Sequence, residues 1–154
     1  NRNLVNTSGV AVSASAGYAM LTRGGLSLFE FYATPSEGIN DSQIEAALKE
    51  EIAKIVNEGV TKDELNRVKT GVIAGDVYQK DSVFSQGMLI GQLETMGYSH
   101  KLMDQYIKNI KKVTSKQIQN VAAKYLIDDR LTVVTLNPQT IDPNHKSQGK
   151  PHVH

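Results

Sequence analysis

Apolar and polar residues alternate with a period of two near the start of the chain. Between residues 9 and 20, small apolar residues alternate with alanine and serine, which predicts a half-buried strand. An Arg-Gly-Gly turn at residues 23–25 precedes a second predicted strand at residues 26–33, which is rich in aromatic side chains. Two such runs around a short glycine turn predict an antiparallel hairpin.

The period then changes to three and four residues, which predicts four helices between residues 40 and 126. Three of these helices begin at capping pairs: Asn40 with Gln43, Thr61 with Glu64, and Thr114 with Gln117. The first helix ends at Gly59, the second runs to residues 97–99 with a kink expected at residues 80–82, and a shorter one covers residues 103–110.

A third strand is predicted at residues 131–136, and the polar residues 139–154 are expected to form a mobile tail. Two strands, four helices and a final strand indicate an α+β domain over residues 1–138, with helices packed on one face of a mostly antiparallel sheet. Three strands are few for so much helix, so we expect further strands upstream of residue 1. The chain does not begin with methionine or a signal peptide, and we interpret it as an N-terminally truncated fragment.

Composition excludes several classes of function. The net charge of +1 gives no field that would favour nucleic acid, and no apolar stretch approaches the ~20 residues that span a membrane. We therefore expect neither a nucleic-acid partner nor a membrane. The absence of cysteine excludes disulfides and thiolate metal sites.

No catalytic or metal-binding residues are predicted in this chain. A zinc site needs protein ligands held rigidly. Three of the four histidines (His145, His152 and His154) lie in the expected tail, and His100 follows a turn where it caps or decorates the next helix. Asp104 with any nearby serine forms no triad, because nothing orders a nucleophile, a base and an orienting group.

Charged clusters have simple structural interpretations. Glu45, Glu50, Glu51 and Glu58 fall away from the apolar stripe of their helix, among Lys49 and Lys54, as expected of a solvated face with salt bridges. The basic cluster Lys108, Lys111, Lys112 and Lys116 surrounds a helix C-terminus, which attracts cations. Four helical glycines, Gly71, Gly75, Gly87 and Gly91, are expected to allow close packing, so replacement of Gly75 or Gly91 by alanine is predicted to lower thermal stability.

Several strings, in this order, resemble the C-terminal, non-zinc domain of the pitrilysin/insulinase family of zinc metallopeptidases. They cover nearly everything from residue 10 to residue 138: residues 12–18 (VSASAGY), 28–35 (LFEFYATP), 58–65 (EGVTKDEL), 81–86 (DSVFSQ), 113–114 with the helix that follows, and 131–136 (LTVVTL). Each string is weak by itself, but their ordered sum is fairly specific.

The resemblance implies paired α/β domains that face one another around a chamber. Zinc would be bound in the N-terminal domain of the parent protein by a His-x-x-Glu-His helix and a distal glutamate, with no cofactor in this chain. Many relatives hold substrate through an arginine and, seven residues later, a tyrosine; here the tyrosine position is Asn6 and Arg2 fails the spacing, so neither role is carried over and the substrate-binding residues are unknown. Bacterial relatives are often exported, which suggests a periplasmic or other extracytoplasmic location.

The sequence therefore predicts a non-catalytic domain of a zinc metallopeptidase, which contributes chamber wall, peptide contacts and an assembly surface. Its expected partners are an N-terminal catalytic domain or partner subunit, a peptide substrate, and a second copy through an exposed sheet edge at residues 10–16. The alternatives are a scaffold or binding subunit of the same fold without peptidase activity, and an unrelated α+β binding module.

Overall fold

The computed structural model describes residues 2–19, 22 and 27–137. A π-helix, η1 (Arg2–Thr7), leads into strand β1 (Ala11–Tyr18), which pairs with β2 (Phe29–Pro35). Five α-helices follow: α1 (Asp41–Glu58), α2 (Lys62–Lys80), α3 (Val83–Thr95), α4 (Leu102–Lys112) and α5 (Ser115–Tyr125). A short 3-10 helix, η2 (Asp128–Arg130), ends the regular structure. The predicted α+β class is confirmed.

The hairpin is antiparallel, as predicted, but its facing residues do not follow a simple alternation. A bulge between Ala11 and Ser13 shifts the register, so that Ala11 lies opposite Pro35 and Ser13 opposite Thr34. Because one extra residue reverses the parity of the strand, Ala11 and Ala14 are both buried although they are three positions apart. The predicted turn at residues 23–25 and the predicted tail at 139–154 lie outside the described residues.

All three predicted capping boxes are present. The side chains of Asn40, Thr61 and Thr114 accept hydrogen bonds from the backbone N–H three residues later, and the side chains of the later residues reach back to the cap. Each box satisfies two of the free N–H groups of a helix start, which fixes where the helix begins. The long second helix is interrupted at residues 81–82, where α2 ends and α3 begins.

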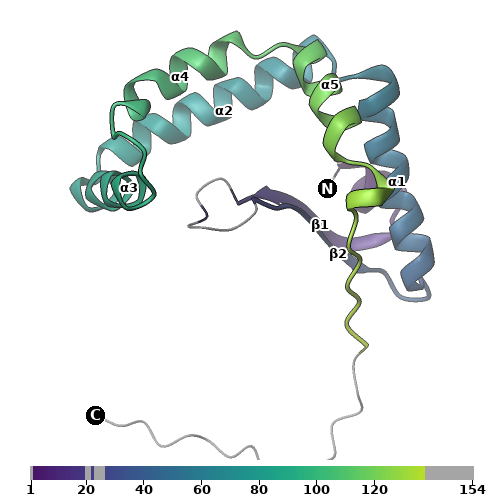
Figure 1. Ribbon diagram of the computed structural model, residues 1–154. Helices are drawn as coiled ribbons and strands as arrows, with labels where there is room; N and C mark the ends of the chain where they lie inside the picture. The colour runs from purple at the N-terminus through teal and green to yellow at the C-terminus, as the bar shows by residue number, and fades with distance from the viewer. Residues whose placement is uncertain (1, 20–21, 23–26, 138–154) are drawn as a thin grey trace, which may run out of the picture.

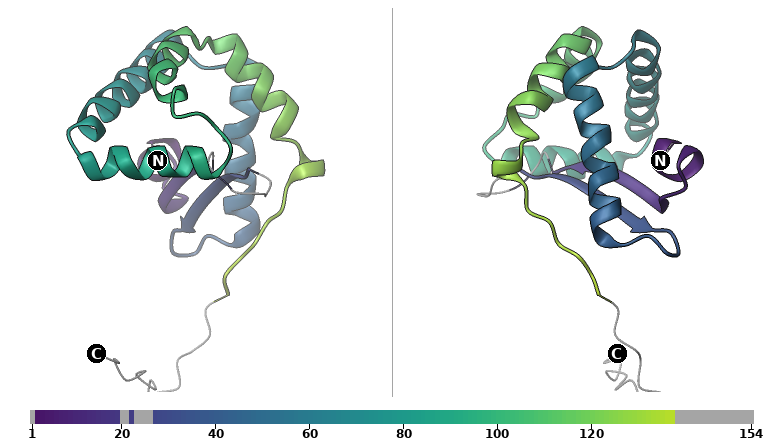
Figure 2. Two further views of the ribbon diagram at one scale, coloured as in Figure 1. Left: turned by 60° about the vertical axis from the view of Figure 1, so that its left-hand side comes forward. Right: turned by 90° about the vertical axis from the view of Figure 1, so that its right-hand side faces the viewer.

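The main core lies where α1 crosses the hairpin. Ile44 packs there with Leu4 of η1 and with Ala11 and Ala14 of β1. Figure 1 shows α5 beside α1 at this end of the molecule, while α2, α4 and α3 form an arm that extends away from the hairpin. The views in Figure 2 agree, with α3 at the far end of the arm. Each described helix is too short or too polar to cross a lipid bilayer.

The strand predicted at residues 131–136 is not formed. These residues belong to no helix or strand, and they lead away from α5 and the rest of the fold (Figures 1 and 2). A strand needs a neighbour to satisfy its backbone groups, and the described sheet contains only β1 and β2. The apolar pattern is therefore present in the sequence without the pairing that would make it a strand.

Candidate functional site

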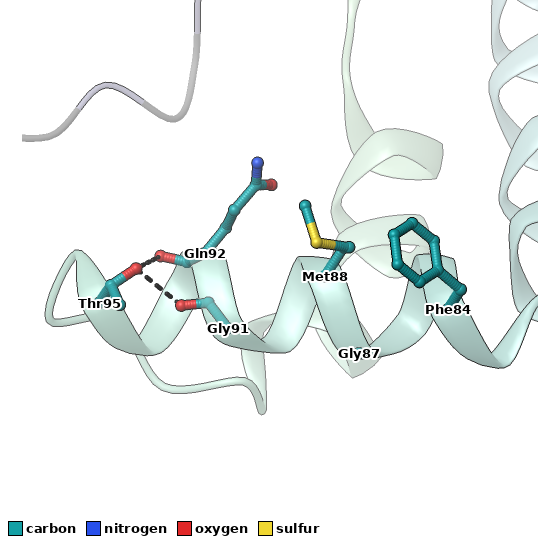
Figure 3. Close-up of a pocket in the computed structure, with 6 residues that line it drawn as sticks. All are labelled: Phe84, Gly87, Met88, Gly91, Gln92 and Thr95. Atoms are coloured by element: carbon teal, nitrogen blue, oxygen red, sulfur yellow. Dashed lines mark hydrogen bonds between the residues drawn. The ribbon is translucent and has the colours of Figure 1, made fainter. Parts of the chain in front are cut away.

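The candidate site is an open groove on helix α3, with a volume of about 500 Å³. Six residues line it: Phe84, Gly87, Met88, Gly91, Gln92 and Thr95. Figure 3 shows Phe84, Met88 and Gln92 projecting from the same side of the helix, as residues four apart must. We call these six residues the α3 groove.

Helix α3 has the composition of a buried helix. It carries a single charged residue, Glu94, near its C-terminal end. Helices that are apolar on most sides are normally covered by other elements. Here only Leu93 is buried, whereas the Phe84 side chain is 77% exposed and that of Met88 50% exposed. The α3 groove is therefore an apolar surface without a cover among the described residues, and such surfaces are typical of contact sites.

Among the described residues no element packs closely on the helical glycines, so that prediction is wrong. A Cβ atom built on Gly71, Gly75, Gly87 or Gly91 would meet no described atom within 4 Å beyond its chain neighbours and the backbone of its own helix. In α3 the two glycines instead deepen the groove beside Phe84 and Met88. Thr95 lines one end of the groove. Its hydroxyl donates hydrogen bonds to the backbone carbonyl oxygens of Gly91, at 2.7 Å, and Gln92, at 3.0 Å (Figure 3).

Polar side chains join α5 to the end of α1 at the base of the arm that carries the groove. Gln119 of α5 donates to the carbonyl oxygens of Val56, at 2.9 Å, and Asn57, at 3.1 Å, in the last turn of α1. The Ser115 hydroxyl donates to the carbonyl oxygen of Val60 at 2.7 Å. Free carbonyls at a helix end need partners. These contacts therefore fix α5 against the end of α1, and no pattern in the sequence predicts them.

Lys69 makes an equivalent contact farther along the arm. Its ammonium group donates to the carbonyl oxygens of Lys111, at 2.9 Å, and Val113, at 2.6 Å, at the end of α4. The basic cluster predicted at this helix end does not include Lys69, which comes from α2. A cation at a helix C-terminus complements the helix dipole, so Lys69 stabilises the packing of α2 against α4.

The acidic residues of α1 lie as predicted on a solvated face. Lys49 pairs with Glu45 at 3.0 Å and with Asp128 at 3.1 Å, and Lys54 pairs with Glu50 and Glu51. The Lys54 ammonium is the main cause that lowers the pKa of Glu51. These ion pairs are exposed, so they contribute little stability.

Zinc ligands are not brought together by the part of the chain that the structure describes. No three of its histidine, aspartate and glutamate side chains lie close enough to hold a metal ion. His100 is engaged with Glu94, its Nδ1 atom lying 2.8 Å from a carboxylate oxygen. His145, His152 and His154 lie outside the described residues.

Comparisons with known proteins identify a family that the first part of the chain resembles. Residues 1–72 match the family model described as the Peptidase M16 inactive domain. The resemblance to the C-terminal, non-zinc domain of pitrilysin-type peptidases is confirmed. The matched residues, the first 72 of the chain's 154, comprise η1, the hairpin, α1 and the first half of α2. No curated protein matches the chain.

A solved structure shares the fold of this chain over more than the 72 residues that the family model matches. It is a protease from Helicobacter pylori, with a TM-score of 0.76 and 19% sequence identity. The similarity covers 82% of this chain but only 30% of the Helicobacter chain. At this identity the likeness shows the fold alone, and the present chain spans about a third of that protein's length.

The Glu94–His100 contact predicts that the stability of this chain depends on pH. The backbone N–H of His100 donates to the Glu94 carboxylate, and this bond, followed by the contact with the His100 side chain, lowers the pKa of Glu94 from its ordinary value of 4.5. A lowered folded-state pKa contributes stability above the unfolded-state pKa, and this contribution is lost as the pH falls through the folded-state pKa.

Replacement of Glu94 by Gln should therefore lower the melting temperature at pH 7 and have progressively less effect below about pH 4.5. Melting curves of the wild type and the variant between pH 7 and pH 3 measure how the difference between their melting temperatures decreases. Glu37→Gln, at an exposed turn, is the control. A gap that stays constant down to pH 3 would show that the carboxylate charge contributes nothing.

Proposed function

We propose that this chain is the non-catalytic domain of a zinc peptidase of the M16 type, in which it forms part of the wall of a peptide-binding chamber. The match of residues 1–72 to the M16 inactive domain carries the proposal. The shared fold with a Helicobacter protease whose chain is much longer supports it, because the remainder of such a protein provides room for a catalytic domain.

The zinc of the proposed enzyme belongs to an N-terminal catalytic domain or to a partner subunit. The described residues of this chain do not fit a zinc ion, since they offer no group of three suitable ligands. We therefore assign this chain no step of the hydrolysis. Its contribution is to bind the peptide and to enclose it in the chamber.

The α3 groove is the surface that we assign to contact with a peptide or with the catalytic domain. Its walls are Phe84 and Met88, and its floor is formed at Gly87 and Gly91, where backbone is uncovered. An apolar groove of this kind accepts apolar side chains without demanding a fixed set of hydrogen bonds. This property suits a chamber that holds different peptides.

A scaffold subunit without peptidase activity is the second candidate, because inactive-domain sequence alone is compatible with either role. The two differ in what lies upstream of Asn1. A His-x-x-Glu-His sequence there, or in a polypeptide that copurifies with this chain, identifies the enzyme. Its absence from both identifies the scaffold.

Peptidase assays provide the functional test. Purified alone, the chain should show no chelator-sensitive cleavage of a fluorogenic peptide library. Mixed with the polypeptide that carries His-x-x-Glu-His, it should raise cleavage by at least about tenfold, because enclosure positions the peptide. Chelator-sensitive cleavage by the chain alone would contradict the proposal, as would a mixture no more active than the zinc polypeptide.

The variant Phe84→Asp in the same mixture tests the α3 groove. The side chain is 77% exposed, so folding should be unaffected, while the stimulation should fall. Tyr78→Asp is the matched control, since its side chain is 75% exposed and lies outside the groove. Equal stimulation by both variants would remove the groove from the proposal and leave the role of the domain intact.

A further inference from the structure

Helix α4 carries a row of lysines on its outer side. Lys101, Lys108 and Lys112 are separated by seven and four residues, which places them within about 40° of one another around the helix axis. Lys101, at the N-cap, already has helical backbone angles, with φ −58° and ψ −16°. Met103 and Ile107 are half-buried on the opposite side, where α4 lies along α2 (Figures 1 and 2). The three lysines are exposed, and we call them the lysine row.

The lysine row has no carboxylate partner among the described residues. Lys49 and Lys54 on α1 pair with glutamates, and Lys80 on α2 pairs with an aspartate, but no such ion pair is formed on α4. Residues 101–112 contain four lysines and a single acid, Asp104. Their net charge is +3, whereas that of the whole chain is +1. The outer side of α4 is therefore a local positive surface.

The helix dipole explains only part of this charge. Lys111 and Lys112 lie in the last turn, where the negative end of the dipole attracts cations. Lys101 lies at the other end, where the dipole repels a cation, and its side chain caps no backbone group. Lys108 and Lys112 are in addition four residues apart, a spacing at which like charges destabilise a helix. The row thus opposes the stability of its own helix, which is typical of residues that serve binding.

We propose that the lysine row binds an acidic segment of peptide, through ion pairs between its ammonium groups and carboxylates of the peptide. The inference rests on the proposed function and names its substrate class, which is peptides rich in aspartate and glutamate. The row extends over about 16 Å of helix, which corresponds to about five residues of extended peptide.

The surroundings of the row favour a peptide over a lipid surface. Leu102 and Tyr106 lie along one side of the row, 45% and 38% exposed, and offer contacts to apolar side chains of the peptide. A helix that binds lipid inserts its apolar side into the membrane. Here the apolar side of α4, with Met103 and Ile107, is turned toward α2.

Fluorescence anisotropy of the whole chain tests the binding. The probe is a labelled peptide in which glutamate alternates with serine, and its control has glutamine in place of each glutamate. At about 10 mM salt the glutamate peptide should bind at least about tenfold more tightly than the glutamine peptide. Most of this difference should be lost at about 0.3 M salt, because exposed charges are then screened. Equal binding of the two peptides at low salt would overturn the proposal.

The triple variant Lys101→Gln/Lys108→Gln/Lys112→Gln tests the lysine row itself. Binding of the glutamate peptide should weaken at least about fivefold, because each exposed ion pair contributes a small amount. Folding should be kept, since glutamine and lysine have similar helix propensities. Replacement of the same three lysines by arginine keeps the charge and should keep the binding. Undiminished binding by the glutamine variant would overturn the proposal.

The matched control is Lys62→Gln/Arg67→Gln/Lys124→Gln, which removes the same charge at exposed positions outside α4. Its binding should change by less than about twofold, because at a distance only the overall charge acts. An equal loss in the control and in the α4 variant would show that net charge alone attracts the peptide, and would overturn the proposal.

Other anions and the cleavage assay complete the test. A single-stranded oligonucleotide and phosphatidylserine vesicles should bind more weakly than the glutamate peptide, and tighter binding of either would overturn the proposal. The binding assay contains no zinc polypeptide, so its outcome is independent of the peptidase test. In a mixture that cleaves, the wild type should favour library peptides with glutamate and the glutamine variant of the row should not. Cleavage without this preference would overturn the substrate class and leave the proposed function intact.

Discussion

Replacement of Ile44 by alanine is expected to lower the free energy of unfolding by about 2–4 kcal/mol. The Ile44 side chain is 8% exposed and fills the space between α1 and the hairpin, where it packs with Leu4, Ala11 and Ala14. Two of these neighbours are alanines with no rotamers, so they cannot move to fill the cavity left by the truncation. Urea unfolding followed by circular dichroism measures the loss.

The size of this effect follows from how small the core is. The described residues contain six buried apolar side chains, of which three are alanines, so Ile44 accounts for a large part of the buried apolar volume. Val68→Ala is the control, because Val68 is 58% exposed on α2 and its truncation should change the stability by no more than about 0.5 kcal/mol. Similar losses at both positions would mean that the core does not lie under α1.

Helix starts were predictable from the sequence because they depend on neighbouring residues alone. Asn40, Thr61 and Thr114 each cap the N–H three residues later, and each partner lies within one turn. Nothing distant in the chain has to be known. The same holds for Gly59, whose positive φ ends α1 where the sequence placed the end.

Strand faces were harder to predict because a bulge leaves no mark in this sequence. A strict period of two separates Ala11 from Ala14, whereas the register shift between Ala11 and Ser13 places both on the core. Bulges are often marked by glycine, but here the residue at the shift is Val12. The parity of β1 depends on its partner strand, and pairing is not encoded locally.

Periodicity predicts an apolar face but not what covers it. The pattern through Val68, Val77 and Phe84 predicted one kinked helix where the structure has α2 and α3, and all three side chains are largely exposed. The segment at residues 131–136 is the same case for a strand, since its composition favours extended backbone but the described sheet contains only β1 and β2. Burial is a property of the assembled protein, and a pattern shows only which surfaces need a cover.

The contacts that hold the arm could not be predicted, because they join polar groups far apart in the sequence. Gln119 reaches the end of α1 over 63 residues, and Lys69 reaches the end of α4 over 44 residues. Neither side chain lies in a motif. Their partners are backbone carbonyls, which every residue has, so no residue type marks the other half of the contact.

Replacement of Gly59 by alanine is the second large effect expected, a loss of about 1–3 kcal/mol in the free energy of unfolding. Gly59 has φ 77° and ψ −162°, a conformation that is essentially restricted to glycine. In addition, an added Cβ would lie 3.1 Å from the Ser115 hydroxyl oxygen, which bonds the carbonyl oxygen of Val60. The substitution therefore strains the backbone and displaces a contact that joins α5 to the end of α1.

Gly75→Ala separates the conformational effect from the general effect of removing a glycine. Gly75 lies inside α2 with no atom within 4 Å of an added Cβ, so the same change should stabilise the protein by up to about 1 kcal/mol. The two variants should thus shift the urea midpoint in opposite directions. If both variants lost stability, the result would indicate that the helical glycines are closely packed and would contradict the open surface of α2.

The double variant Gly59→Ala/Ser115→Ala then divides the loss at Gly59 into its two causes. Ser115→Ala removes the hydroxyl that the new Cβ would meet, but it leaves the backbone conformation of residue 59 unchanged. If crowding dominates, the double variant should lose clearly less than the sum of the single variants, because the crowded contact no longer exists. If backbone strain dominates, the losses should add. Additive losses would show that the stability is lost through backbone strain at residue 59. Any chain with this backbone conformation between α1 and α2 would then need glycine at that position.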